Sequence, residues 1–131
     1  MTKAIGSLLN RIADNSALKI NSEIENIDGI FEREGELSIY RIIQECLNNV
    51  MKHSEAARVT VKIVNSERSI LIKISDDGKG FEAKDQNSTE KREGFGLIGM
   101  TERVRILGGT LHIISAVGQG TTIKLEIWKH K

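Results

Sequence analysis

The clearest pattern along the chain is a helical stripe of apolar residues between positions 37 and 53. Apolar side chains recur there at steps of three and four residues, which places them on one face of a helix. They are Ile39, Ile42, Ile43, Cys46, Leu47, Val50 and Met51. A shorter stripe predicts another helix over residues 3–14, and the apolar positions from Leu97 to Val104 predict a third that ends at Gly108-Gly109.

Other stretches alternate apolar and polar residues, as half-buried β-strands do. Residues 59–63 and 70–74 flank a short polar segment and are expected to form a hairpin. A second strand pair is expected near 110–115 and 121–128, and the apolar positions around Leu18–Ile20 indicate a strand after the first helix. The order αβαββ–loop–αββ favours a single domain in which helices pack on one face of a mixed sheet.

Composition narrows the class of protein without identifying one. The 131 residues suffice for one domain with its own core, and the 39% hydrophobic and 28% charged fractions are ordinary for a globular protein. Nineteen basic and eighteen acidic residues leave a net charge of +1, which gives no drive toward nucleic acid or an anionic membrane. No apolar run approaches the length of a bilayer crossing, and a single cysteine fits a reducing compartment. We therefore expect a cytoplasmic α/β domain.

The polar face of the long helix carries the first group of candidate residues. At about 100° per residue, Glu45, Asn49 and Lys52 fall within a narrow arc, with Arg41 and Asn48 beside it. A solvated helix face would explain such a pattern. Two adjacent asparagines inside a helix are costly, however, and oxygen coordination of Mg²⁺ would give a reason for them.

The second candidate group follows the strand predicted at residues 70–74. Asp76 stands at the strand end, and Gly78 and Gly80 follow it at spaced positions. A carboxylate placed there can accept a hydrogen bond from an exocyclic amine, and the glycines permit a ligand to approach the backbone closely. A plain Asp-Gly turn is the alternative, and a calcium loop lacks its acidic run and closing glutamate.

The third candidate group is the glycine-rich stretch that opens the predicted third helix. Gly94, Gly96 and Gly99 match the spacing G-x-G-x-x-G, and the free amides of a helix start suit phosphate oxygens. A Rossmann motif would directly follow a hydrophobic strand. Here residues 82–93, which have no apolar side chain beyond Ala83, come first and predict a long mobile loop.

Taken in this order, these segments resemble the GHKL ATPases, the superfamily of gyrase, Hsp90, MutL and the sensor kinases. IYRIIQECLNNVMKHSEA resembles the N box of histidine kinases allied to the nitrate and lipid-fluidity sensors. DDGKGF resembles the G1 box, GFGLIGMTERV the G2 box, and GGTLHIISAVGQGTTIKLEI the closing strands. The resemblance implies the Bergerat fold for residues 1–131: a two-layer α/β sandwich with a mixed, mostly antiparallel sheet backed by helices.

The same resemblance implies roles for the residues of the N box. Glu45 would polarise a water or help to shape the magnesium site, and Asn49 would ligate Mg²⁺ between the phosphates. Geometry alone would also allow Asn48 as the ligand, and the family spacing selects Asn49. Lys52 and His53 would face the phosphates or the ribose.

The resemblance assigns the adenine and phosphate contacts to the other boxes. Asp76 would bind the adenine amino group, with support from Thr121 through a bound water, and Gly78 and Gly80 would let the nucleotide approach. Residues 82–95 would form a lid over ATP. The phosphate-binding set is completed by Gly94, Gly96 and Leu97.

As a function, the resemblance implies that the chain binds Mg-ATP and donates the γ-phosphate to a histidine in two-component signal transduction. That histidine is expected on an upstream dimerisation and phosphoacceptor domain of a longer parent, because His53, His112 and His130 do not stand in the acceptor pattern. A response regulator would be the next partner, and the parent can be an inner-membrane sensor. No contact with nucleic acid or membrane is expected of this domain. The alternatives are a stand-alone regulatory module, such as an anti-sigma-factor serine kinase, and a degenerate domain that only docks.

Overall fold

A computed structural model describes residues 1–80 and 97–129, apart from the side chains of residues 53, 54, 97 and 98. The expected lid over residues 82–95 therefore lies outside the described residues. The described elements are helices, a π-helical turn and strands. They are α1 (Thr2–Asp14), β1 (Lys19–Ile24), α2 (Arg33–Asn49), the π-helical turn η1 (Val50–Ser54), β2 (Arg58–Asn65), β3 (Ser69–Asp76), α4 (Leu97–Ile106), β4 (Gly109–Ser115) and β5 (Thr121–Trp128).

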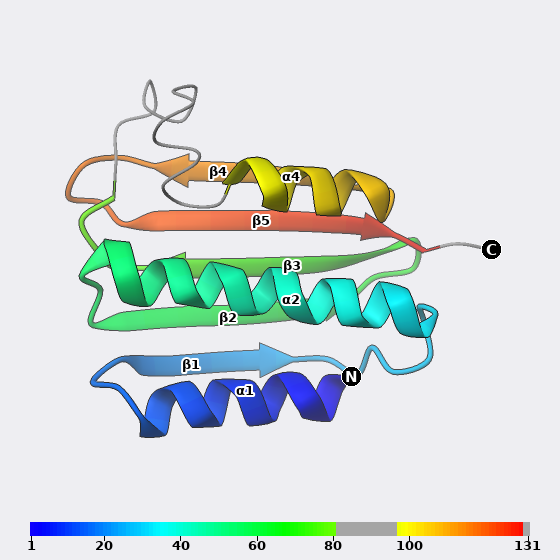
Figure 1. The fold of residues 1–131 in the computed structure, drawn as a ribbon, viewed down its shortest axis with the longest axis horizontal. Helices are drawn as coiled ribbons and strands as arrows, with labels where there is room; N and C mark the ends of the chain where they lie inside the picture. Colours follow the sequence, from blue (N-terminus) through cyan, green and yellow to red (C-terminus); the bar gives the residue numbers. More distant parts are fainter. Residues whose placement is uncertain (81–96, 130–131) are drawn as a thin grey trace.

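The strands form one sheet in the order β1-β2-β3-β5-β4. β1 pairs with β2 in parallel, and the pairs β2–β3, β3–β5 and β5–β4 are antiparallel. Helices α1, α2 and α4 all lie over one face of this sheet (Figure 1). The expected two-layer α/β sandwich with a mixed, mostly antiparallel sheet is therefore confirmed.

The core lies between the helices and the sheet because the strands alternate in burial. On β3, Ile70, Ile72 and Ile74 are buried, while Leu71 and Lys73 between them are exposed on the opposite face. Helix α2 adds fully buried side chains such as Ile39 and Ile43 to the same core. The second face of the sheet carries no described element, so only one face of each strand is covered.

Two element boundaries differ from the expectation based on sequence. The long helix begins earlier, at Arg33, and its last residues form the π-helical turn η1 instead of further α-helix. The wider i→i+5 turn changes the phase of the stripe, so Met51, expected on the apolar face, is 44% exposed. Gly108, with a φ of 79°, ends α4, whereas Gly109 already belongs to β4.

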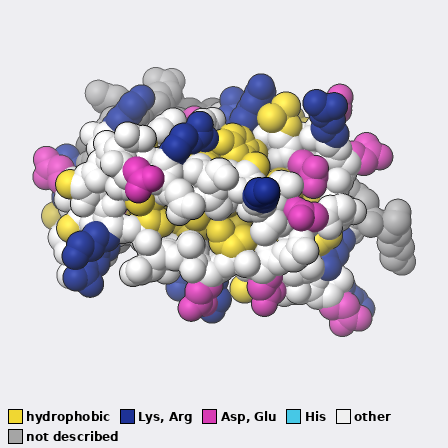
Figure 2. Space-filling model, turned by 90° about the horizontal axis from the view of Figure 1, so that it is seen from below, with side chains coloured by type: hydrophobic (Ala, Val, Ile, Leu, Met, Phe, Trp, Pro, Cys, Tyr) yellow, Lys and Arg dark blue, Asp and Glu magenta, His cyan; other side chains and the backbone are white. Residues whose placement is uncertain are grey.

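The molecule seen from the side of α1 and β1 shows apolar side chains in the middle of the view, surrounded by charged ones (Figure 2). The view looks onto an edge of the sheet, because β1 has a strand partner, β2, on one side only. Among the described residues, no helix combines the length and the apolar character needed to cross a membrane.

Candidate functional site

The candidate residues come from elements whose ends meet at one end of the molecule. The C-terminal ends of α2, β3 and β4 lie there together with the N-terminal ends of α4 and β5 (Figure 1). Asp76 is the last residue of β3, Thr121 the first of β5, and Leu97 the first of α4. Segments that are far apart in the sequence therefore border one region of the surface.

A row of polar side chains crosses the sheet at this end. Asp76 pairs with Thr121 of β5, and Thr121 pairs with Ser115 of β4. Each of them is in step with the buried residues of its strand, so the row faces the helix layer. The hydroxyl groups of Ser115 and Thr121 lie 2.9 Å apart, and Ser115 also donates to the carbonyl oxygen of Gly120 at 3.1 Å. Thr121 is thereby held beside Asp76.

Asp76 is half-buried, and its surroundings act on the carboxylate in two directions. Burial raises the pKa of Asp76 above its ordinary value, because desolvation penalises the charged form. The backbone amides of Gly78 and Thr121 oppose this shift by donating to the carboxylate, the first at 2.8 Å. The result is a shielded carboxylate held in place by backbone donors, which can accept a hydrogen bond from a ligand on the helix side of the sheet.

Asp77 has a different role from that of its neighbour. Its carboxylate accepts hydrogen bonds from the backbone amides of Ala57 and Arg58, each at 2.9 Å, and so fastens the start of β2 to the end of β3. The hydrogen bond from Arg58 is the main cause that lowers the pKa of Asp77. Asp76 faces the candidate site while Asp77 holds the backbone beneath it.

Two glycines allow the chain to pack closely just after Asp76. A Cβ on Gly80, which has a φ of 61°, would overlap the carbonyl oxygen of Ala116, and one on Gly120 would overlap that of Asp76. Gly118 donates from its backbone amide to the carbonyl oxygen of Lys79 at 2.7 Å. The described contacts of Gly80 are thus with the turn between β4 and β5, which is brought against the end of β3.

The helix-borne candidates occupy the end of α2 and the turn η1. The Glu45 carboxylate forms an ion pair with Arg103 of α4, with Nη1 and Oε2 2.9 Å apart, and keeps 32% of its side-chain surface exposed. Asn49 is half-buried and has an interaction partner within the protein. Lys52 is exposed on η1. Of the remaining candidates, the side chains of His53 and Leu97 are not described, and Gly94 and Gly96 lie outside the described residues.

Two buried sulfur atoms meet between helices α2 and α4. The Cys46 thiol lies 3.5 Å from the thioether sulfur of Met100, and both residues are fully buried. Desolvation is the main cause that raises the pKa of Cys46 to about 12, so its reactive thiolate form is suppressed at neutral pH. Cys46 is therefore a packing residue between two helices that carry candidate site residues.

Sequence reasoning missed two residues of this site. Ser115 stands at the end of an ordinary alternating strand, and only the register of β4 on β5 places its hydroxyl group next to Thr121. Asp77 is adjacent to the predicted Asp76, and sequence reasoning gave it no role of its own. Strand alternation could have separated them, because Asp76 is in step with the buried Ile70, Ile72 and Ile74.

Comparison with known proteins places this arrangement in a family. Residues 34–131 match the family described as histidine kinase-, DNA gyrase B-, and HSP90-like ATPases. The match spans most of the chain, from the start of α2 through the last strand. The chain belongs to this ATPase family.

Curated proteins that are similar to this chain carry the names of histidine kinases. The chain is 36% identical over 115 residues to the signal transduction histidine-protein kinase/phosphatase DegS of Bacillus subtilis, a match that covers 86% of this chain and 30% of that protein. It is 43% identical over 98 residues to DegS of Brevibacillus brevis, covering 74% of this chain and 24% of that one. The matched region is thus less than a third of the length of each relative.

Solved structures of histidine kinases share the fold. The mycobacterial sensor histidine kinase MprB superposes with a TM-score of 0.77 at 22% identity, over 99% of this chain and 95% of that one. At this level of identity the likeness concerns the fold alone. It agrees with the sheet order and the one-sided helix layer described above.

Proposed function

We propose that this chain is the ATP-binding catalytic domain of a sensor histidine kinase. In this proposal it binds Mg-ATP at the end where α2, α4 and the strand ends meet, and donates the γ-phosphate to a histidine on a separate dimerisation domain. The observation that carries the proposal is the half-buried Asp76 carboxylate, held by backbone amides on the helix side of the sheet in a chain of this ATPase family. The names of the similar curated proteins favour histidine as the acceptor.

We assign adenine recognition to the sheet side of the site. Asp76 accepts a hydrogen bond from the exocyclic amino group of adenine, and Thr121, kept in place by Ser115, supports it through a bound water. Gly78 supports Asp76 through its amide, and Gly80 lets the backbone turn closely there. An amine donor matches this acceptor, whereas a carbonyl at the same ring position would face a carboxylate and be rejected.

We assign the phosphates and the metal to the helix side. Asn49 supplies an oxygen ligand to Mg²⁺, which usually takes one or two protein ligands together with substrate phosphates and waters. Glu45 would polarise a water or help to shape the magnesium site, and its Oε2 is paired with Nη1 of Arg103 at 2.9 Å. Lys52 and His53 face the phosphates or the ribose, and the start of α4 supplies amides at the positive end of its dipole. Those amides are assigned to Gly94, Gly96 and Leu97, and the lid to residues 82–95.

In such a site the protein positions the reactants and neutralises charge, and the nucleophile comes from outside. The imidazole nitrogen of the acceptor histidine attacks the γ-phosphorus, the bond to the β–γ bridging oxygen breaks, and ADP leaves with the electron pair. Bound Mg²⁺ would neutralise charge on the phosphates. A response regulator would then take the phosphoryl group from the histidine.

Calorimetric titration with Mg-ATP and Mg-ITP tests the adenine assignment, because ITP carries a carbonyl in place of the amino group. The chain should prefer ATP, and Asp76→Asn should weaken ATP binding by about tenfold or more, as expected for a lost charge-assisted hydrogen bond. Asp77→Asn is the matched control, and it should keep the preference because the Asp77 carboxylate accepts from the backbone amides of Ala57 and Arg58 and does not face the ligand.

The stability of Asp76→Asn separates loss of binding from loss of fold. The folded-state pKa of Asp76 is raised, so its ionised form opposes folding at neutral pH, and the neutral asparagine should unfold at no lower denaturant concentration. A stable Asp76→Asn variant with undiminished ATP affinity would disprove the adenine assignment.

Metal dependence and phosphotransfer test the rest of the proposal. Asn49→Asp should alter the magnesium dependence of ATP binding while leaving the binding of adenosine unchanged. Mixing the chain with radiolabelled ATP and a separately produced dimerisation domain should label histidine, which is recognised by an acid-labile, base-stable phosphate. An acid-stable label on a serine of a protein partner would instead support the anti-sigma-factor type of kinase.

A further inference from the structure

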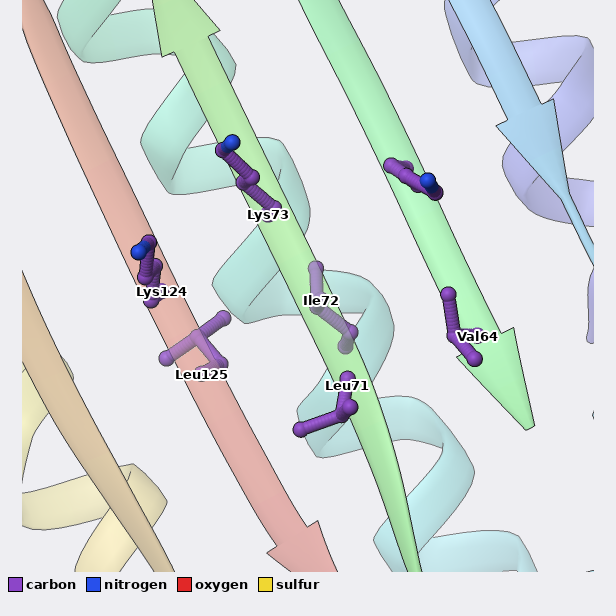
Figure 3. Close-up of a pocket in the computed structure, with 7 residues that line it drawn as sticks. Val64, Leu71, Ile72, Lys73, Lys124 and Leu125 are labelled. Carbon is purple, nitrogen blue, oxygen red and sulfur yellow. The ribbon is translucent and has the colours of Figure 1, made fainter. Parts of the chain in front are cut away.

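The face of the sheet opposite the helices carries a row of basic side chains. The register aligns Glu23, Lys62, Lys73, Lys124 and His112 across β1, β2, β3, β5 and β4. The three lysines stand directly opposite one another on adjacent strands, and all of them are exposed. Figure 3 shows Lys73 and Lys124 on neighbouring strands, with the helices behind the sheet.

Within the described strands, two carboxylates share this face of the sheet: Glu23 of β1, and Glu126 of β5, which stands opposite Leu71 and accepts a hydrogen bond from the Ser69 hydroxyl at 2.8 Å. Lys62 forms an ion pair with Glu23 at the edge of the sheet, at 3.8 Å. Neither Lys73 nor Lys124 has a salt bridge to any residue in the described ranges 1–80 and 97–129. Like charges directly opposite on neighbouring strands destabilise a sheet, so the arrangement reduces the stability of the free chain.

An apolar groove lies directly beside the lysine row. It has a volume of about 220 Å³, and its exposed lining is formed by Val64, Leu71 and the three lysines. Ile72 and Leu125 also line it, although their side chains are buried in the core on the other face of the sheet. Leu71 is 38% exposed, and Figure 3 shows it on the same strand as Lys73, with Val64 on the neighbouring strand β2. Lysine stems are apolar, so they extend the walls of the groove while their amino groups stand at its rim.

Further exposed apolar residues stand on the same face. Ile114 is 57% exposed and Trp128 is 45% exposed, and both are in step with the outward-facing residues of their strands. In the register they stand at opposite ends of β5, Ile114 opposite Thr122 and Trp128 opposite Ser69, and they add apolar surface to this face beyond the groove. The repulsion between the aligned lysines weakens the sheet, and a local cost in stability of this kind is expected at a functional surface.

We propose that this open sheet face is a docking surface for an acidic protein segment that presents an apolar side chain between carboxylates. The apolar side chain enters the groove between Val64 and Leu71, and the carboxylates pair with Lys62, Lys73 and Lys124. The proposal concerns the face away from the helices, so it is independent of the nucleotide site.

The geometry favours a protein over other anionic partners. A groove receives a protruding side chain, which neither a lipid headgroup layer nor a phosphate backbone presents. Single-stranded nucleic acid would need stacking rings, and aromatic residues make up only 4% of the chain. A peptide segment with several carboxylates and one apolar side chain matches both the positive charge of the lysine row and the apolar groove.

The test uses the ¹⁵N-labelled chain and a pentapeptide probe, Glu-Glu-Leu-Glu-Glu with blocked ends, titrated near physiological ionic strength. Chemical shift changes should cluster on the amides of residues 62–64, 71–73 and 124–126 and leave Asp76 and Thr121 unmoved. Replacing the central leucine of the probe with alanine should weaken binding, because the groove is then empty.

Matched charge variants locate the interaction. Lys73→Gln combined with Lys124→Gln should weaken binding about threefold or more, as expected for two exposed ion pairs. Lys3→Gln combined with Arg33→Gln removes the same charge from the helix layer and should have no such effect. The Lys73→Gln and Lys124→Gln variant should also resist urea better than the parent at low salt, since cross-strand repulsion is relieved.

Several outcomes would overturn the proposal. They are equal losses in the two double variants, shifts located elsewhere, insensitivity to the leucine, or the absence of binding. Preferential binding of phosphatidylserine vesicles or of single-stranded DNA at the same lysines would overturn it too, because the partner would then be a lipid surface or a nucleic acid.

Discussion

Gly120 is the position where a single added methyl group should affect both the fold and the candidate site. Its φ of 76° lies in the left-handed region, and a Cβ there would overlap the carbonyl oxygen of Asp76 and lie 3.0 Å from its carbonyl carbon. Gly118 has nearly the same φ of 77°, and a Cβ added to it would meet no atom beyond its chain neighbours within 4 Å. The two alanine variants therefore differ in the steric contact and share the backbone strain.

The expected free energies of unfolding follow from these two contributions. A left-handed conformation costs an L-residue about 1–2 kcal/mol, which is the whole expected loss for Gly118→Ala. Overpacking against backbone adds about 1–3 kcal/mol, so Gly120→Ala should lose about 2–5 kcal/mol. The difference between the variants, about 1–3 kcal/mol, measures the close approach of the turn between β4 and β5 to the end of β3.

Urea unfolding followed by circular dichroism measures both values, and calorimetry with Mg-ATP gives a second readout. Relief of the overlap has to move Asp76 or the turn, so Gly120→Ala should also weaken nucleotide binding in molecules that remain folded, whereas Gly118→Ala should not. Equal losses of stability in the two variants would refute the reasoning, because strain alone would then explain both.

Two further predictions concern titratable groups. Asp77 has a lowered folded-state pKa, so its stabilising effect is complete above the unfolded pKa of about 3.9 and is lost as the pH falls through the folded value. Asp77→Asn should therefore flatten the dependence of stability on pH below about pH 4, as urea midpoints across that range would show; an unchanged slope would contradict the assignment. Cys46, with a pKa raised to about 12, should resist iodoacetamide at about pH 8 in the folded chain and react on unfolding. Mass spectrometry of the alkylated peptide checks this, and rapid labelling without unfolding would argue against a sealed contact between α2 and α4.

The elements were predictable where the pattern of burial is local. The alternation of Ile70, Ile72 and Ile74 with polar residues indicates a strand with one covered face, and β3 has that pattern of burial. The stripe of Ile39, Ile43 and their neighbours likewise predicts a helix. Each of these patterns depends on residues two to four positions apart, so they are present in the chain before it folds.

The errors arose where a local pattern continued past a change in backbone geometry. Met51 is in phase with the apolar stripe for an α-helix, but η1 turns more slowly and leaves it exposed. Nothing in residues 37–53 indicates the π-helical turn. The start of α2 at Arg33 was missed because the apolar stripe begins only at Ile39, and the first turn of the helix carries charged residues and Gly35.

By itself, the sequence determined the elements, the one-sided core and the family to which the chain belongs, because periodicity and ordered motifs are properties of the chain. The tertiary structure decided which polar groups meet. The register of β3, β5 and β4 brings Asp76 to Thr121 and Thr121 to Ser115, and the register of β2, β3 and β5 aligns Lys62, Lys73 and Lys124 on the opposite face. Register depends on pairing between segments that are distant in sequence, and a shift by one residue would exchange the two faces of a strand. For that reason neither the support of Asp76 nor the basic row could be predicted from local pattern.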